Sequence, residues 1–301
     1  MIKELLDDNQ YKVITDIELP KEKTKLVKSI DKELFIHNKD YEKISTPLLY
    51  PLEEYGKKSF NRYNISQYLI FKQCKRRFFM DYYWEINLNL NLDPSINEGE
   101  SSILSGIDRG NIVHNFCNLY RQGMDKEKLI KNILNSYGII YGKDIEVELR
   151  PYIDNYISYY SEDYDTMYSE KSFHIKIGDG YLKGIIDRIV IKDDKIEILD
   201  FKTNRLWNRG QLVEYYKPQL QLYAYALEKI IGKKVDKASI LFLERGIKES
   251  IDVSPKALKE NMDNIIEFIK YIEENDIIEK YPSSSNCDQY CPHKEFCNLL
   301  Y

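Results

Sequence analysis

The chain has 301 residues, of which 43% are hydrophobic and 13% aromatic. A chain of this size can bury one large core or two modest ones, and its apolar content excludes wholesale disorder. The formal net charge of −5 argues against a general polyanion-binding surface, so any nucleic acid must be held locally, by a basic groove, bound cations or a partner. The start lacks the basic head and apolar run of a signal peptide, and no apolar stretch approaches the roughly 18–20 residues of a membrane span, which favours a cytoplasmic protein.

The first part of the chain is polar and weakly patterned. Short strands are predicted only at residues 11–19 and 34–37. We therefore expect residues 1–62 to be an appendage or the end of a preceding domain, followed by one domain over residues 63–301.

Helical periodicity then dominates up to residue 160. Helices are predicted at residues 65–84, 110–121, 126–137 and 145–160. Ser66 is a suitable N-cap for the first helix, because its hydroxyl can accept a hydrogen bond from an N–H of the first turn.

Strict apolar–polar alternation follows, and it predicts strands at residues 169–177, 181–191 and 195–201. Asp193 and Asp194 suit the hairpin turn between the last two strands. The next predicted elements are a long amphipathic helix at residues 213–231, strands at 238–243 and 250–253, and a helix at 255–275. Helices, a three-strand meander, then helix and strand together predict an α+β fold.

The sharpest local signal lies in two of these strands, in Gly184-Ile-Ile-Asp187 and Asp200-Phe-Lys202. On adjacent antiparallel strands, Asp187 and Asp200 can meet at one end of the sheet. Asp200 and Lys202 are two residues apart and share a face, while Phe201 points into the core. Two carboxylates and a backbone carbonyl suit a hard cation such as Mg²⁺, which activates water at a phosphate, and a nearby ammonium can position that water. Exposed hairpin charges are the alternative, which the surrounding apolar runs disfavour.

These segments resemble the RecB-family branch of the PD-(D/E)xK nucleases, including the nuclease domains of AddAB-type helicase–nucleases. That family has Gly-x-x-His on a helix, a glutamate on the first strand, Gly-x-x-Asp on the second, Asp-x-Lys on the third and Gln-x-x-x-Tyr on the next helix. The matching residues follow in the same order: Asn111-Ile-Val-His114, Glu170, Asp187, Asp200-Phe-Lys202 and Gln219-Leu-Gln-Leu-Tyr223. The resemblance implies a restriction-endonuclease-like core, an α-β-β-β-α-β mixed sheet with added helices.

The resemblance also implies a metal site. Its ligands would be His114, Asp187, Asp200 and the Phe201 carbonyl. The ion would be Mg²⁺ or Mn²⁺, and a histidine ligand fits Mn²⁺ better. For His114, a helix histidine packed in the core is the alternative.

The other site residues would support the reaction. By the resemblance, Glu170 is an auxiliary acid and Lys202 is the catalytic base or the group that orients water. Gln219 and Tyr223 lie one turn apart on one helix face and would support the active site, with Tyr223 also contacting DNA. A polar rim on an amphipathic helix is the alternative for this pair.

The chain has five cysteines, at positions Cys74, Cys117, Cys287, Cys291 and Cys297. In a reducing cytoplasm, an odd set with three members crowded near the C-terminus indicates a metal or cluster site and not a disulfide framework. Cys117 is expected to be a small buried apolar side chain.

The resemblance implies that Cys74 and the three C-terminal cysteines within residues 287–297 hold a 4Fe–4S cluster, a clasp that acts as a structural staple. Lys75 stands where the family has a proline after its first cysteine. A zinc site with four cysteines is the alternative, and His293 could replace one thiol.

DNA contact is expected from Arg76 and Arg77 on the first predicted helix, because cations there can hold phosphates. The sequence has no phosphate-loop motif, and so no ATP motor is expected. By the resemblance, the partners are DNA, preferentially single-stranded, and a separate superfamily-1 helicase domain or helicase chain. Equally compatible with the sequence is a free-standing nuclease.

These features together predict a metal-dependent deoxyribonuclease, an exonuclease or endonuclease that prefers single strands and acts in DNA end processing. A non-catalytic iron–sulfur scaffold of the same fold, binding DNA or a helicase, is the first alternative. It is disfavoured because a scaffold gains nothing from clustered buried charges. A nuclease of RNA is a further alternative.

Overall fold

The computed structural model describes residues 60–86, 103–178, 180–204, 208–285, 287, 291–294 and 297. All of them belong to one compact unit, Lys57–Tyr301. The strands predicted at residues 11–19 and 34–37 lie outside the described residues, as does nearly all of the expected appendage. None of the helices in the described part of the chain is long and apolar enough to cross a membrane.

From α4 onward, the helices and strands follow one another in the order that the sequence predicts. The helices are α2 (Ile65–Gln73), α3 (Lys75–Tyr82), α4 (Gly106–Leu119), α5 (Lys126–Ser136), α6 (Lys143–Tyr159), α7 (Arg209–Ile231) and α8 (Pro255–Glu274). The strands are β1 (Arg62–Asn64), β2 (Thr166–Ile177), β3 (Gly180–Lys192), β4 (Lys195–Lys202), β5 (Lys237–Phe242) and β6 (Ile247–Ile251). Helices α4–α6, strands β2–β4, helix α7 and strand β5 form the expected α-β-β-β-α-β series, which confirms the α+β fold class.

The sheet is mixed. Strands β2, β3 and β4 are antiparallel neighbours, β4 and β5 are parallel across the α7 crossover, and β6 is antiparallel to β5. Strand β3 is long enough to serve two partners along one edge, with β1 beside Tyr181–Lys183 and β4 beside Arg188–Lys192. Asp193 and Asp194 turn the β3–β4 hairpin with φ values of 48° and 65°, as the tightest hairpin turns require. The predicted turn is confirmed.

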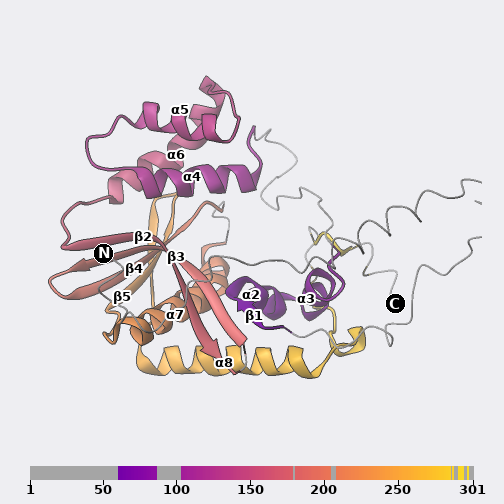
Figure 1. Ribbon diagram of the computed structural model, residues 1–301. Coiled ribbons are helices and arrows are strands. Elements are labelled where there is room, and N and C mark those ends of the chain that lie inside the picture. Colours follow the sequence, from indigo (N-terminus) through magenta and orange to yellow (C-terminus); the bar gives the residue numbers. More distant parts are fainter. Residues whose placement is uncertain are drawn as a thin grey trace, which may run out of the picture. The chain divides into compact units, whose positions relative to one another are not determined.

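Each face of the sheet has its own core (Figure 1). Helices α4–α6 lie on one side, and α7 and α8 lie on the other. On β4, Ile196 and Ile198 belong to the core beneath α7 and α8, while Leu199 and Phe201 belong to the core beneath α4 and α6. This alternation directs Asp200 toward α7 and the Phe201 ring toward α4 and α6.

The single helix predicted at residues 65–84 is wrong, because the chain breaks it at Cys74, which is extended with φ −158° and ψ 112°. The predicted N-cap is also wrong. Asn64 caps α2 by accepting a hydrogen bond from the Gln67 N–H, and the Gln67 side chain accepts one from the Asn64 N–H. This reciprocal pair satisfies two N–H groups of the helix start, which Ser66 inside the first turn cannot do.

Element ends depart from prediction elsewhere too. Helix α4 begins before residue 110 because the Ser105 hydroxyl accepts from the Asp108 N–H and caps it there. Strand β1 was not predicted, since three residues carry no periodic signal. Strand β6 ends before residue 253, because the Asp252 carboxylate accepts from the Ser254 N–H and this local turn replaces further strand pairing.

Candidate active site

Strands β3 and β4 separate where two aspartates face each other. The register pairs Arg188 with Leu199, so Asp187 lies opposite Asp200 just beyond the last ladder pair. The Phe201 N–H donates to Asp187 Oδ2 at 2.7 Å, and this side-chain bond takes the place of the next ladder bond. The register therefore places Asp187 and Asp200 at the same end of the sheet, as the sequence predicts.

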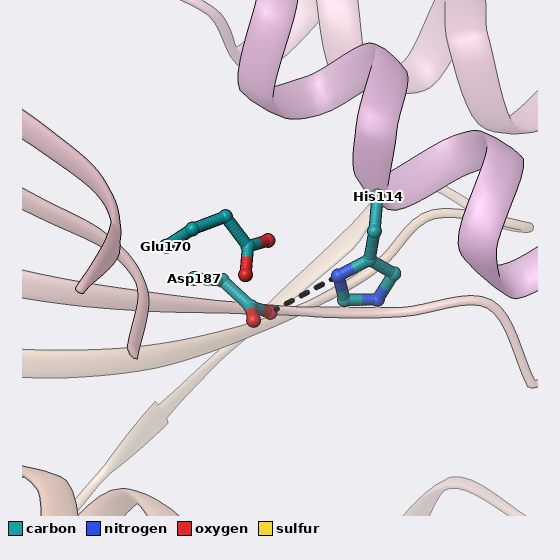
Figure 2. A group of neighbouring side chains, drawn as sticks. All are labelled: His114, Glu170 and Asp187. Carbon is teal, nitrogen blue, oxygen red and sulfur yellow. Dashed lines mark ion pairs between the residues drawn. The ribbon is translucent and has the colours of Figure 1, made fainter. Parts of the chain in front are cut away.

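Two further groups, from a helix and from a neighbouring strand, approach Asp187 (Figure 2). His114 on α4 lies with Nδ1 3.7 Å from Asp187 Oδ2. Glu170 on β2 lies opposite Asp187 in the β2–β3 register. One ligand atom from each of His114, Glu170 and Asp187 falls within 4.8 Å of the others. Two carboxylates and an imidazole at this spacing can hold a divalent cation.

Glu170 has an unusual backbone. Its φ is 51° in the middle of a strand, a left-handed conformation that costs a non-glycine residue on the order of 1 kcal/mol or more and occurs preferentially at functional sites. The two ladder pairs on either side of it keep the same register, so the distortion is confined to this residue. The sequence located Glu170 only loosely, because Glu146, Glu148 and Glu162 are nearby in the chain. Nothing in the alternation of β2 signals the left-handed conformation.

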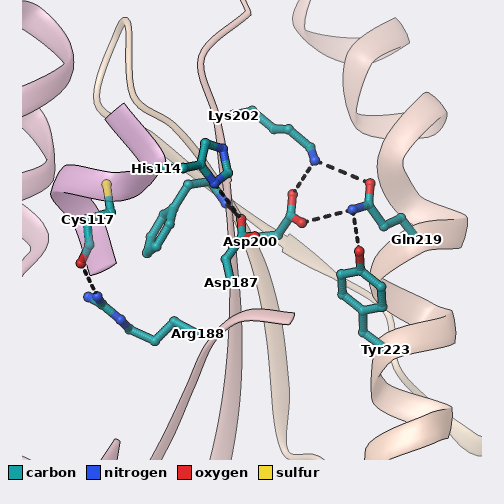
Figure 3. A network of polar contacts seen from close by, with 9 residues as sticks. His114, Cys117, Asp187, Arg188, Asp200, Lys202, Gln219 and Tyr223 are labelled. Carbon is teal, nitrogen blue, oxygen red and sulfur yellow. Dashed lines mark hydrogen bonds and ion pairs between the residues drawn. The ribbon is translucent and has the colours of Figure 1, made fainter. Parts of the chain in front are cut away.

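Asp200, Lys202 and Gln219 form a closed polar group on the side of the sheet that faces α7 (Figure 3). Lys202 Nζ lies 2.8 Å from Asp200 Oδ2. Gln219 Nε2 donates to Asp200 Oδ1 at 3.1 Å, and Lys202 Nζ donates to Gln219 Oε1 at 3.3 Å. Gln219 Nε2 also lies 2.8 Å from the Tyr223 hydroxyl. The structure thus brings together the Asp-x-Lys and Gln-x-x-x-Tyr residues.

Burial shapes the electrostatics of this group. Asp200 is 1% exposed, and burial, with Asp187 adding to it, raises the pKa of Asp200 to about 6 although Lys202 opposes the shift. Burial works against the charged form of Lys202, but Asp200, Tyr216 and Asp187 together outweigh it, and the pKa of Lys202 is raised. Burial raises the pKa of Tyr223, and the nearby charge of Asp200 raises it further. At neutral pH the group therefore holds an ammonium and a neutral phenol beside a carboxylate.

Two glycines permit close approach at the site. A Cβ on Gly184 would lie 2.6 Å from the Phe173 ring and 3.0 Å from the Tyr223 ring. A Cβ on Gly110 would lie 3.4 Å from the Thr203 hydroxyl. Gly184 thus lets Tyr223 pack directly over β3, and Gly110 lets α4 lie against the end of β4.

Arg188 has a role that the sequence reasoning missed. It is 3% exposed, and its guanidinium donates to the Tyr156 hydroxyl. It also donates to the Cys117 carbonyl (Figure 3). Cys117 lies one turn after His114 on α4, so Arg188 ties β3 to the helix that carries the histidine. Its place next to Asp187 was the signal that could have singled it out.

Tyr216 was missed as well. Its ring lies under the Lys202 ammonium at 4.3 Å from Nζ, and its hydroxyl donates to Asn204 Oδ1 at 2.8 Å. Tyr216 precedes Gln219 by one helical turn, and this spacing could have placed it beside the lysine. The aromatic face favours the charged form of Lys202.

The four cysteines expected to share a ligand interact with one another. Burial raises the pKa of Cys291 and of Cys297, and the Cys74 and Cys287 thiols raise both further. The fifth cysteine, Cys117, lies elsewhere and is 1% exposed, which confirms the expectation that it is a buried apolar side chain. Thiols are soft donors that suit an iron–sulfur cluster or zinc. Among the residues that the structure describes, however, the ligand atoms that lie within 4.8 Å of one another belong to His114, Glu170 and Asp187, and not to these cysteines.

The two arginines on α3 differ. Arg76 is 6% exposed, and its Nε donates to the Tyr281 carbonyl at 2.6 Å. A guanidinium buried in this way is not available to a phosphate, so the expectation of DNA contact by Arg76 is not carried further. Arg77 is partly exposed and pairs with Asp81 at 3.4 Å. His293 Nε2 also lies 2.5 Å from Asp81, so this ring contacts α3.

Comparison with known proteins identifies the family. Residues 62–298 match the PD-(D/E)XK nuclease superfamily. The RecB component of the RecBCD enzyme of Borreliella burgdorferi is 43% identical over 74 residues, which are 21% of this chain and 6% of RecB. An ATP-dependent helicase/nuclease protein of Clostridioides difficile is 26% identical over 179 residues, 54% of this chain and 13% of that protein.

A second ATP-dependent helicase/nuclease protein, from Ligilactobacillus salivarius, is 41% identical over 63 residues, 21% of this chain and 5% of its own length. Among solved structures, a candidate exonuclease from Eubacterium rectale has a TM-score of 0.45 and 15% identity, covering 82% of this chain and 93% of its own. The matched stretches are thus a small part of these curated relatives. Because the superfamily match extends over most of the chain, the protein belongs to the PD-(D/E)XK nuclease superfamily.

Proposed function

We propose that this protein is a divalent-metal-dependent nuclease that hydrolyses DNA phosphodiester bonds. The observation that carries the proposal is that Asp187 lies opposite Asp200 where β3 and β4 separate, and that Lys202 pairs with Asp200 there. Membership of the superfamily supports hydrolysis as the reaction. The names of the relatives, a component of RecBCD and two helicase/nuclease proteins, support DNA as the substrate and a helicase domain or helicase chain as the partner.

The proposed metal ligands are Asp187, Asp200, His114 and the Phe201 carbonyl, with Glu170 beside them. This hard oxygen set fits Mg²⁺ or Mn²⁺, and the imidazole favours Mn²⁺. A divalent cation bound there supplies positive charge against the phosphate and lowers the pKa of water.

The chain's own groups orient the reaction. Lys202, held as an ammonium by Asp200, positions the attacking water and balances charge that develops on the phosphate. Gln219 bonds to both partners of this ion pair and keeps their geometry, and Tyr223 contacts Gln219 in turn. Arg77, which is partly exposed, is the proposed contact to the DNA strand. Tyr223 is only 4% exposed, so the DNA contact expected of it is not carried further, for the same reason as that of Arg76.

We further propose that single-stranded DNA is preferred. The net charge of −5 offers no broad surface for a duplex backbone, and a helicase partner would deliver a separated strand. End-labelled and circular single strands distinguish exonuclease from endonuclease action, because a circle has no end from which to begin.

The four cysteines Cys74, Cys287, Cys291 and Cys297 are proposed to hold a 4Fe–4S cluster that staples the helix pair α2–α3 to the C-terminal segment. Zinc on the same thiols is the alternative. Protein purified without oxygen is expected to be brown, with broad absorbance near ~400 nm and with bound iron and sulfide. Colourless protein that contains zinc would decide for the alternative.

The central experiment compares wild type with Asp200→Ala and Lys202→Ala on labelled single-stranded, duplex and circular DNA, with and without Mn²⁺. We expect wild type to cleave only with metal and each variant to lose at least ~10³-fold in rate. Asp163→Ala and Lys233→Ala are matched controls, because both residues are exposed and pair with residues outside the candidate site. Full activity in either site variant contradicts the mechanism, and a wild type that binds DNA without cleaving it supports the scaffold alternative.

A further inference from the structure

One face of the β2–β3 pair is exposed between the candidate active site and the Gly180 end of β3. On β3, Leu182 and Ile186 are buried in the core beneath α7 and α8. The alternate residues Tyr181, Lys183 and Ile185 point to the opposite face, where Tyr181 is 50% exposed and Ile185 is 52% exposed. Two large apolar groups are thus exposed to solvent beside a lysine on a regular strand.

The strand register extends this face to β2 and β1. Cross-strand pairs join β2 to β3 at Lys176 with Tyr181, His174 with Lys183, and Ser172 with Ile185. The next pair along the same face is Glu170 with Asp187, the acids of the candidate metal group. On the other edge of β3, Arg62 lies beside Tyr181.

A hollow of about 410 Å³ is lined by Arg62, His174, Tyr181 and Lys183. These four side chains, from three different strands, therefore surround one space. We call the surface formed by Arg62, His174, Lys176, Tyr181, Lys183 and Ile185 the β2–β3 face.

The charge of this face is opposite to that of the chain. It carries three cations and a histidine. Among the described residues of β2 and β3, carboxylates occur only at the end of this face next to the candidate metal group, at Glu170 and Asp187. In a chain with a net charge of −5, this arrangement provides a local basic surface. At about 3.3 Å per residue, Lys183 lies roughly 13 Å and Tyr181 roughly 20 Å along β3 from Asp187.

We propose that the β2–β3 face binds the DNA strand on one side of the scissile phosphate and leads it to Asp187. The inference rests on the proposed nuclease function and specifies its substrate path. Lys176, Lys183 and Arg62 contact phosphates, while Tyr181 and Ile185 offer apolar surface to bases. Alternating cations and stacking surfaces fit a single strand, because in a duplex the base faces are stacked on each other and cannot reach Tyr181.

The test measures binding in a metal chelator, so that no cleavage occurs. The anisotropy of a labelled single-stranded oligonucleotide is followed across a salt series for wild type and for Lys176→Ala/Lys183→Ala. We expect affinity at low salt to fall about tenfold or more, and the log–log salt slope to decrease by about 1.4, since each cation lost from a single-strand contact removes about 0.7. The matched control is Lys256→Ala/Lys259→Ala on α8, which removes the same charge and is expected to keep both values.

A second variant separates stacking from charge. Tyr181→Ala is expected to weaken binding at least ~fivefold with no change in the salt slope, whereas Tyr137→Ala, at an exposed tyrosine next to α5, is expected to bind as wild type does. Circular dichroism checks that each exposed-site variant melts like wild type, and Lys183→Gln replaces the double variant if that one unfolds.

The inference is overturned if the lysine double variant binds with wild-type affinity and slope, if the α8 control loses as much, or if duplex binds more tightly than single strand. Failure of the proposed nuclease function is a separate result. A wild type that binds single strands through this face, yet cleaves none with Mn²⁺, refutes hydrolysis and leaves the binding surface standing.

Discussion

Two regions of this molecule join distant parts of the chain, and they do so by different means. At the candidate active site, Asp187, Asp200 and Lys202 are held by strand register, a backbone N–H and Gln219. In the cysteine region, burial raises the pKa of Cys291 and Cys297, so these thiols are protonated unless a metal binds. The first geometry is set by the fold itself, whereas the proposed cluster would be what fixes the second.

This contrast predicts that a charge can be removed from the candidate active site without loss of stability. Asp187→Asn keeps the shape of the side chain and removes its charge, so cleavage should fall by ~10³-fold or more while the melting temperature stays close to that of wild type. Glu170→Gln should cost less, about tenfold, because Glu170 is exposed at the edge of the group. Single-turnover cleavage with Mn²⁺ measures both, and a Glu170→Gln loss equal to that of Asp187→Asn would refute the ranking.

The cysteine region should behave in the opposite way. Cys74→Ala is expected to lose bound metal and to lower the free energy of unfolding by about 3 kcal/mol or more, with a smaller effect on the cleavage rate of the folded fraction. Cys117→Ala is the matched control, expected to cost only about 1 kcal/mol for the lost buried volume and to retain all metal. Metal analysis and denaturant unfolding decide the matter, and equal metal loss in both variants would contradict the assignment of the fifth cysteine.

Acid should weaken metal binding at the active site. The pKa of Asp200 is raised to about 6 from 3.8, so the folded protein holds this proton more tightly than the unfolded chain. The ionisation of Asp200 therefore destabilises the metal-free fold as the pH rises from about 4 to about 6, and a cation that binds the carboxylate offsets the loss. We expect Mn²⁺ to raise the melting temperature at pH ~7.5 and to have little effect at pH ~5. An equal shift at both values would show that Asp200 is not a ligand.

The smallest expected effect concerns packing behind the site. Gly184→Ala places a methyl group against the Phe173 and Tyr223 rings, which should cost about 1–3 kcal/mol and slow cleavage by displacing Tyr223. Gly210→Ala on α7 is the control, because nothing lies within 4 Å of the new methyl group and alanine favours a helix, which should raise stability by up to ~1 kcal/mol. Thermal unfolding of the two variants should therefore shift in opposite directions.

Much of the fold and the centre of the site were predictable. Alternation in β2–β4 and the Asp193–Asp194 turn predicted the meander, and the turn placed Asp187 opposite Asp200. The i, i+4 spacing predicted that Gln219 and Tyr223 share a helix face. The break at Cys74 was not predictable, because the apolar positions before and after it continue without interruption, and the cap that begins α3 at this residue is set by a single thiol.

The sequence by itself determined which residues share a face of a strand or a helix, because that is a local property of a repeating backbone. Only the tertiary structure decided which faces meet. It turned Arg76 inward to the Tyr281 carbonyl, gave Glu170 its left-handed backbone, and set Arg188 against α4. Each of these depends on elements far apart in the chain packing together, and no local pattern of residues carries that information.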